Sequence, residues 1–299
     1  NLDLFRSLAA AIDDANVVWN GLQRLEVVSV TLDQDRDEPQ LVFESMNSTG
    51  LDLETSDLVR NYMLMGCSMA EQKTLYEDYW LPMERVLGNL SFDVFLHDWM
   101  VVTLKKPVLK GHVMYAEFKR FAADSSLPRM ERTRNLLANM LEYAKYYAAI
   151  KGVAAAGSCD MNVDRRLESI QKLGSTVTDP LVMYMFAAWK RDRVSCDGLL
   201  RMLADLESYL FRRMICSVSS NGLNKLVPSL IVRLDSAEDD LAETFAALLI
   251  TETAKASRMP TDSEFRQALL GENLYRPAWR CKYLLAGLEN YNHPKDPRS

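Results

Sequence analysis

The chain has 299 residues, of which 48% are hydrophobic and 25% are charged. This composition excludes a disordered chain or a fibrous repeat and is sufficient for one large or two ordinary domains with a buried core. Glycine (12) and proline (10) are scarce and methionine (15) is abundant, which favours a mainly α protein. The formal net charge of −6 argues against a protein that binds nucleic acid over its whole surface, so any phosphate contact would be local.

Taken in chain order, residues 4–15 are predicted to form a short helix. The next segment, Leu25-Glu-Val-Val-Ser-Val-Thr-Leu32, is rich in β-branched residues and predicts one strand from Leu25 to Leu32. A lone strand needs a partner, supplied either by a missing upstream segment or by another copy. The chain also begins with Asn1 and not with methionine, and we therefore expect an excised fragment: a small α/β remnant over residues 1–64, then a helical domain over residues 65–299.

Start signals and apolar spacing predict helices through the rest of the chain. Three segments match the capping box, in which a hydroxyl caps the third amide and a carboxylate reaches back: residues 68–71, 236–239 and 261–264. Two sets of apolar residues repeat at intervals of three and four and predict buried stripes. The first set is Leu137, Met140, Leu141, Ala144 and Ala148, and the second is Leu199, Leu203, Leu206, Leu210 and Met214.

The cysteines and the apolar segments indicate the compartment. The five cysteines are scattered and form no Cys-x-x-Cys pair, which predicts neither a disulfide framework nor a zinc knuckle. The longest uncharged apolar run, residues 181–189, is too short to span a bilayer, so no membrane contact is expected. A soluble protein of the reducing cytoplasm fits these features best.

Residues suited to catalysis or metal binding are few. Asp93 and His97 lie four residues apart on a predicted helix, with Asp98 beside them, a spacing that would present two metal ligands on one face. No third ligand lies at a useful spacing, so we favour a surface polar pair. No phosphate-binding loop, dinucleotide motif or hydrolase elbow occurs. We predict no catalytic set and no metal site in this chain.

Basic residues gather in four short clusters against the acidic background. Each is a candidate phosphate contact, although solvated charge is the commoner explanation. Arg212 and Arg213 lie within an apolar stretch, so at least one guanidinium should point inward or to an interface and meet a carboxylate. With Asn221 and Asn224 they form a candidate interface or phosphate contact. The other clusters are Lys105, Lys106 and Lys110; Arg129, Arg132 and Arg134; and Arg191 and Arg193.

The most distinctive segment is residues 43–62, FESMNSTGLDLETSDLVRNY. Its pattern predicts a helix, a tight polar turn and a second helix. Asn47, Ser48 and Thr49 supply hydrogen-bond donors and acceptors, and Gly50 lets the backbone approach a ligand closely. The alternative interpretation is a well-capped joint between two helices.

This segment resembles the closing part of the ParB/sulfiredoxin-like domain that opens GmrSD-type, modification-dependent (type IV) restriction endonucleases and their anti-phage relatives. The matching residues are Phe43-Glu44, Asn47-Ser-Thr-Gly50, Leu53 and Asp57-Leu-Val-Arg-Asn61. Residues 92–95, 115–119, 208–213, 220–225, 265–269 and 274–275 are similar to the helical middle region of that family. The resemblance therefore covers nearly the whole chain.

The resemblance implies that the opening domain of such a protein carries an Asp-Gly-Gln-Gln-Arg motif that handles a nucleoside triphosphate, and that a C-terminal His-Asn-His-type domain cuts DNA. Neither motif occurs in this chain. The chain would be the non-catalytic centre of a bacterial anti-phage enzyme, without a cofactor of its own. The nucleoside triphosphate and the divalent metal of the nuclease would belong to the full-length protein.

The partners implied are the flanking domains of the same polypeptide and, through the parent protein, DNA, with a homo-oligomer as a further option. The resemblance also implies that the polar turn completes one wall of the nucleotide pocket, with Glu44 and Asn47 as its main polar contacts. The residues of that wall are Phe43, Glu44, Asn47, Thr49, Gly50 and Asp57.

Two other functions stay open at this point. The first is a free-standing helical interaction module without enzymatic activity, which would bind proteins through Arg212, Arg213 and methionine-rich surfaces. The second is direct DNA contact by the helical part through Lys105, Lys106 and Lys110 or through the arginines of residues 129–134. This second function predicts DNA binding that weakens as salt rises.

Overall fold

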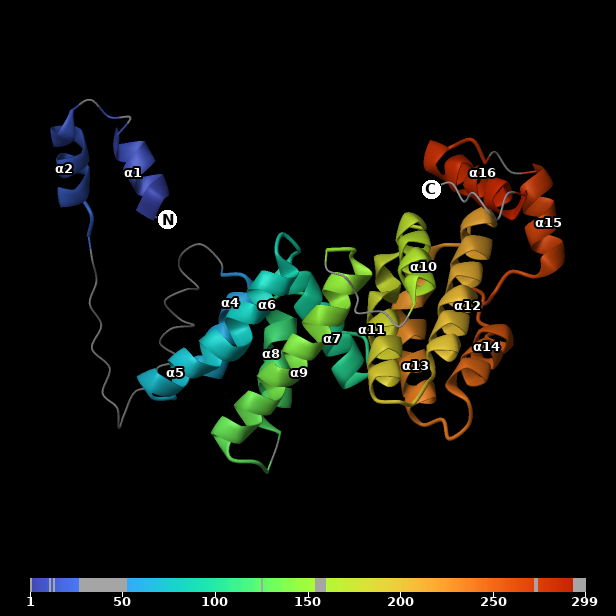
Figure 1. Ribbon diagram of the computed structural model, residues 1–299, viewed down its shortest axis with the longest axis horizontal. Helices are drawn as coiled ribbons and strands as arrows, with labels where there is room; N and C mark the ends of the chain where they lie inside the picture. The colour runs from blue at the N-terminus through green and yellow to red at the C-terminus, as the bar shows by residue number, and fades with distance from the viewer. Residues whose placement is uncertain are drawn as a thin grey trace. The chain divides into compact units, whose positions relative to one another are not determined.

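The computed structural model describes residues 2–10, 12, 14–26, 53–124, 126–153, 160–271 and 274–292. Over these ranges the regular structure is helical, with no strands, which confirms the predicted mainly α fold (Figure 1). The chain divides into two compact units, Asn1–Asp52 and Leu53–Ser299. The strand predicted from Leu25 to Leu32 lies, beyond its first two residues, outside the described part.

The first unit contributes two short helices, α1 (Leu2–Ala10) and α2 (Ala15–Gln23). The sequence predicts one helix over residues 4–15, but α1 ends earlier and α2 begins after Asp14, whose carboxylate accepts the amide hydrogen of Asn16 at 2.9 Å. Phe5 and Trp19 are exposed on these helices. The predicted helix therefore corresponds to α1, and α2, which Asp14 caps, is a second helix that is not predicted from the sequence.

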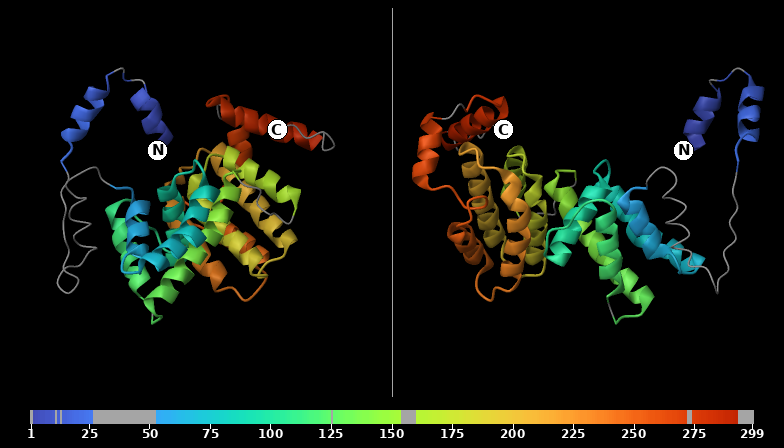
Figure 2. Two further views of the ribbon diagram at one scale, coloured as in Figure 1. Left: turned by 60° about the vertical axis from the view of Figure 1, so that its left-hand side comes forward. Right: turned by 180° about the vertical axis from the view of Figure 1, so that it is seen from behind.

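The second unit is an assembly of helices that runs from α4 to α16 (Figures 1 and 2). Its first half contains α4 (Thr55–Leu64), α5 (Met69–Leu75), the π-helical η1 (Tyr76–Trp80), α6 (Leu81–Leu87), α7 (Phe92–Leu104), α8 (His112–Ala123) and α9 (Arg129–Ile150). Its second half contains α10 (Met161–Lys172), η2 (Thr176–Thr178), α11 (Asp179–Lys190), α12 (Cys196–Ile215), η3 (Ser220–Gly222), α13 (Leu223–Asp235), α14 (Leu241–Thr251), α15 (Asp262–Gly271) and α16 (Ala278–Asn292).

Helix α11 lies at the centre of the second unit, where it packs on α7, α9, α12 and α13. Every residue of α11 from Asp179 to Ala188 is buried. A helix that is covered on all sides needs apolar residues around its whole circumference, which explains the long apolar run at residues 181–189. Within the described part, no helix combines the length and the apolar character needed to cross a membrane.

The unit boundary differs from the division drawn in the sequence. The second half of the distinctive motif, which begins at Asp57, lies in α4, and α4 packs on α7 and α8 inside the second unit. Residues 43–52 of the motif belong to the first unit and lie outside the described residues. The motif therefore spans the junction of the two units.

The predicted apolar stripes are confirmed. All five residues of the α12 stripe are buried, and so are four of the five residues of the α9 stripe; the fifth, Leu141, is half-buried. Each stripe faces the helices on which its own helix packs, because residues three and four positions apart share one side of a helix.

Two of the three predicted capping boxes are confirmed. Ser68 with Glu71 opens α5, and Thr261 with Glu264 makes the reciprocal hydrogen bonds at the start of α15. The box predicted at residues 236–239 is wrong. Ser236 donates its hydroxyl back to the last turn of α13, and Asp240 caps α14 instead.

One cysteine differs from the prediction. Cys196, at the first position of α12, is disulfide-bonded, whereas Cys67, Cys216 and Cys281 are not in disulfides. The spacing of cysteines along a sequence does not report which helices bring two of them together, since a disulfide depends on the distance between Cα atoms in the fold.

Candidate functional site

A polar pocket of about 390 Å³ opens beside the first turn of α4, at the second half of the motif. Side chains of α4, η1 and α6 line it, together with the loop that leads into α7. Its ionic residues are Glu54, Asp57, Arg60 and Glu84. Three carboxylates against one guanidinium make the lining acidic, which disfavours direct contact with the phosphates of a nucleotide.

Arg60 organises the pocket. Its guanidinium donates to Asp57 at 2.7 Å and lies 3.5 Å from Glu84. Glu84 also accepts a hydrogen bond from the indole of Trp80 at 3.0 Å, and the Trp80 ring is stacked on Phe92 at 4.7 Å. Asp57, which the resemblance assigns to the nucleotide pocket, is therefore a partner of Arg60 that helps to hold this lining in place.

Asp93 of α7 fixes the start of α4. Its carboxylate accepts the backbone amide hydrogens of Thr55 at 3.0 Å and Ser56 at 2.7 Å. The first amides of a helix are a natural anion site, and here the anion comes from another helix of the same unit. The start of α4 is thus anchored to α7 by charge-assisted hydrogen bonds.

The other predicted residues of the nucleotide-pocket wall lie outside the described residues. These are Phe43, Glu44, Asn47, Thr49 and Gly50, together with Ser48 between them. Of the six residues that the resemblance assigns to the wall, the structure places only Asp57.

Arg213 points inward, as its apolar neighbourhood predicts, but its partners are not carboxylates. The buried guanidinium donates to the backbone carbonyls of Ser219 at 2.6 Å, Ala256 at 2.8 Å and Arg258 at 3.1 Å. Carbonyl oxygens satisfy the donors of a guanidinium as a carboxylate would. The side chain ties the chain after α14 to the end of α12, so its role is structural.

Arg212 does meet a carboxylate. It donates to Asp262 at 2.6 Å and lies 5.3 Å from the ring centre of Phe265, at the start of α15. Asn221 and Asn224 are exposed. The structure therefore does not unite the four predicted contact residues in one site, because Arg213 faces the interior while the asparagines face solvent.

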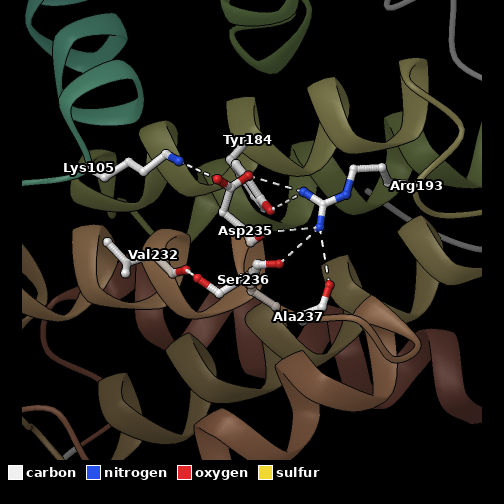
Figure 3. Close-up of polar contacts among 8 residues, drawn as sticks. Lys105, Tyr184, Arg193, Val232, Asp235, Ser236 and Ala237 are labelled. Carbon is white, nitrogen blue, oxygen red and sulfur yellow. Dashed lines mark hydrogen bonds and ion pairs between the residues drawn. The ribbon is translucent and has the colours of Figure 1, made fainter.

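The cluster of Arg191 and Arg193 is also occupied within the fold, as Figure 3 shows for Arg193. The Arg193 guanidinium donates to Tyr184 and to the side chain of Asp235, both at 3.1 Å. It further donates to three carbonyls at the end of α13, where a helix leaves carbonyls without partners. Lys105 pairs with the same Asp235 carboxylate.

The remaining basic clusters are largely used in the same way. Lys106 pairs with Glu117 at 3.0 Å, and Arg129 and Arg132 donate to backbone carbonyls. Lys110 is exposed. The predicted DNA contacts at these positions thus receive little support from the geometry, because most of these cations hold the fold together.

Asp93 and His97 do not act as a metal pair. His97 turns away, with Nδ1 at 2.9 Å from Asp98 and Nε2 at 3.1 Å from the carbonyl oxygen of Val108. In the described ranges no group of three metal-binding side chains occurs. Both ring nitrogens of His97 therefore lie within hydrogen-bond distance of oxygens of the fold.

No pattern in the sequence indicates that a buried group of charges surrounds this pair. Asp98 is buried, and its second oxygen has no hydrogen-bond partner among the described residues. Burial raises the pKa of Asp98 and raises the pKa of Asp179 to about 6, against the lowering effect of Lys151. Lys151 and Asp179 form an ion pair. Asp98 lies on α7, Asp179 on α11 and Lys151 directly after α9, so only the fold brings them together.

No protein-family model, curated protein or solved structure matches the chain. The fold and the site define a mainly α domain in which an acidic pocket lies beside the first turn of α4, the helix that carries the second half of the motif. The resemblance of the motif residues to a known family therefore stays a prediction from the sequence.

Proposed function

We propose that this chain is the helical middle of a bacterial modification-dependent restriction endonuclease. It connects a domain that handles a nucleoside triphosphate to an HNH-type nuclease, and it carries no catalytic set itself. The ordered motif matches from Phe43 to Asn61 and in the later helices support this proposal.

The observation that carries the proposal is the anchoring of α4. The second half of the motif lies in α4, whose first amides bind Asp93 of α7. Arg60, within the motif, contacts Glu84 of α6. The part of the motif that lies in α4 is therefore linked to two other helices of the second unit, as a connector requires.

The alternative of a free-standing interaction module receives less support. Such a module would bind its partner through Arg213, but the Arg213 guanidinium is buried and donates to three carbonyls. Most methionines of the second unit are core residues, with Met69 and Met161 as exposed exceptions. The geometry favours the connector.

The test uses the intact gene product with Asn47→Ala. If Asn47 contacts the nucleotide, triphosphate hydrolysis falls by about tenfold or more, since a lost hydrogen bond to a charged group costs about 1.5–3 kcal/mol. The matched control is Asn20→Ala, which removes an exposed asparagine of α2 and should leave turnover unchanged. A folded Asn47→Ala variant with normal turnover would reject the pocket role.

A further inference from the structure

A groove runs between α10, α12 and α16, remote in sequence from the motif. Two adjoining hollows form it, with volumes of about 450 and 980 Å³. Arg166, Ser169 and Ala204 line both hollows, which makes the groove continuous. Figure 1 shows α10 beside α12, with α16 across their ends.

The groove is strongly cationic. Among the described residues, five basic side chains line it, against one carboxylate, Glu207. Glu207 is already bound, because it pairs with Arg166 and accepts the hydroxyl hydrogen of Tyr283 at 2.8 Å. The five cations are Arg165, Arg166, Lys172, Arg201 and Lys282, and all are exposed. In a chain of net charge −6, this is a local concentration of positive charge.

These cations differ from the clusters that the sequence indicates. Lys172 and Lys282 have no carboxylate within ion-pair distance among the described residues, and the contact of Arg165 is the neutral Asn162 at 3.5 Å. Arg201 lies 3.6 Å from Asp240, near the rim. Most of the positive charge in the groove is thus available to an anion from outside.

Aromatic rings lie along the same groove. Trp279 and Tyr291 of α16 line it and are 43% and 84% exposed. Exposed rings beside exposed cations are the two components by which proteins hold single-stranded nucleic acid: bases stack on the rings and phosphates meet the cations. An acidic peptide would use the cations alone.

We propose that this groove binds single-stranded nucleic acid, independently of the sequence of its bases. The lining of α10 extends from Asn162 to Lys172, which at 1.5 Å per residue is about 15 Å. That length matches about four phosphates of a stacked strand. The phosphates contact Arg165, Lys172 and Lys282, and one base stacks on Trp279. The proposal goes beyond the connector function and does not depend on it.

Binding is measured by fluorescence anisotropy of the 299-residue chain with a labelled oligothymidylate of about 15 nucleotides between about 50 and 200 mM salt. The three phosphate contacts predict a slope of log K against log salt of about −2, at about −0.7 per phosphate of a single strand. No binding at the lowest salt would overturn the proposal.

The charge variant is Lys172→Gln with Lys282→Gln. It should bind more weakly and reduce the steepness of the salt slope by about 1.4. Lys145→Gln with Lys225→Gln removes the same charge from exposed positions on α9 and α13 and should leave the slope unchanged. Equal effects of the two variants would show that the groove is not the site, and would overturn the proposal.

The aromatic variants separate a nucleic acid from other polyanions. Trp279→Leu should weaken oligothymidylate binding about 5- to 150-fold, whereas Trp279→Phe retains a stacking ring and should bind within a few fold of the original chain. Poly-glutamate and duplex DNA of similar charge should bind more weakly than oligothymidylate. Tighter binding of either probe, or no effect of Trp279→Leu, would overturn the proposal.

Discussion

The two adjacent arginines at the end of α12 have different energetic roles. Arg213→Ala leaves the carbonyls of Ser219, Ala256 and Arg258 without their donor in the interior, which should lower the free energy of unfolding by about 3 kcal/mol. Arg212→Ala breaks a pair in which the side chain of Asp262 is 77% exposed, and should cost about 1 kcal/mol or less. Urea denaturation of the two variants measures both values; equal losses would contradict the assignment.

The buried carboxylates predict an unusual dependence of stability on pH. The pKa of Asp179 is about 6 in the folded chain, above about 3.9 in the unfolded chain. The folded state therefore binds more protons between these pH values, and the contribution of Asp179 to stability is largest at low pH. This contribution of Asp179 to the free energy of unfolding falls by up to about 3 kcal/mol as pH rises from about 4 to 6, and it is constant above about pH 6.

The variant Asp179→Asn tests this dependence. Relative to the original chain, it should lose the fall in the free energy of unfolding between about pH 4 and 6. Asp239→Asn, in an exposed loop, is the control and should keep the pH profile of the original chain. Superimposable profiles for Asp179→Asn and the original chain would show that Asp179 titrates alike in the folded and unfolded states.

At the scale of the elements, two residues near the start of α14, Asp240 and Ser236, are candidates for capping that helix. Asp240 accepts the amide hydrogens of Ala242 and Glu243 at 2.8 and 3.0 Å, so Asp240→Ala should lower the free energy of unfolding by about 1 kcal/mol. Ser236→Ala should change it by less than about 0.5 kcal/mol, because Ser236 ends α13. Thermal denaturation of the two variants measures both losses of stability. A larger loss in Ser236→Ala than in Asp240→Ala would support the capping box predicted at residues 236–239.

Local patterns predicted the helices well because each depends on residues a few positions apart. The Ser68 capping box and the α12 stripe need only their own turns to form. The capping box predicted at Ser236 is wrong because a second capping residue, Asp240, lies closer to the apolar run of α14. Partners far apart in sequence were not predictable in this way, as the carbonyl partners of Arg213 and the disulfide at Cys196 show.

At the scale of the whole molecule, the mainly α class follows from composition and periodicity, whereas the sites depend on tertiary packing. The acidic pocket joins Arg60 to Glu84 across two helices. The cationic groove combines residues of α10, α12 and α16, none of which forms a long basic run in the sequence. The net charge of −6 thus describes an average over surfaces of opposite sign.

The connector proposal predicts that α4 transmits the state of the nucleotide to α7, and so to the rest of the second unit, through Asp93. Asp93→Ala removes the carboxylate that binds two amides of α4 from another helix. Asp240→Ala removes a carboxylate that binds two amides of its own helix, and is the control for stability. Both variants should lose about 1–2 kcal/mol of stability, but only Asp93→Ala should reduce the coupling between triphosphate hydrolysis and DNA cleavage.

The most direct test is therefore the ratio of modified-DNA cleavage to triphosphate hydrolysis in the intact gene product with Asp93→Ala. The account predicts hydrolysis close to that of the original protein and cleavage reduced by about tenfold or more, a coupling loss of about 1.4 kcal/mol. Asp240→Ala should keep the original ratio. An unchanged ratio in folded Asp93→Ala protein would contradict the connector role of α4.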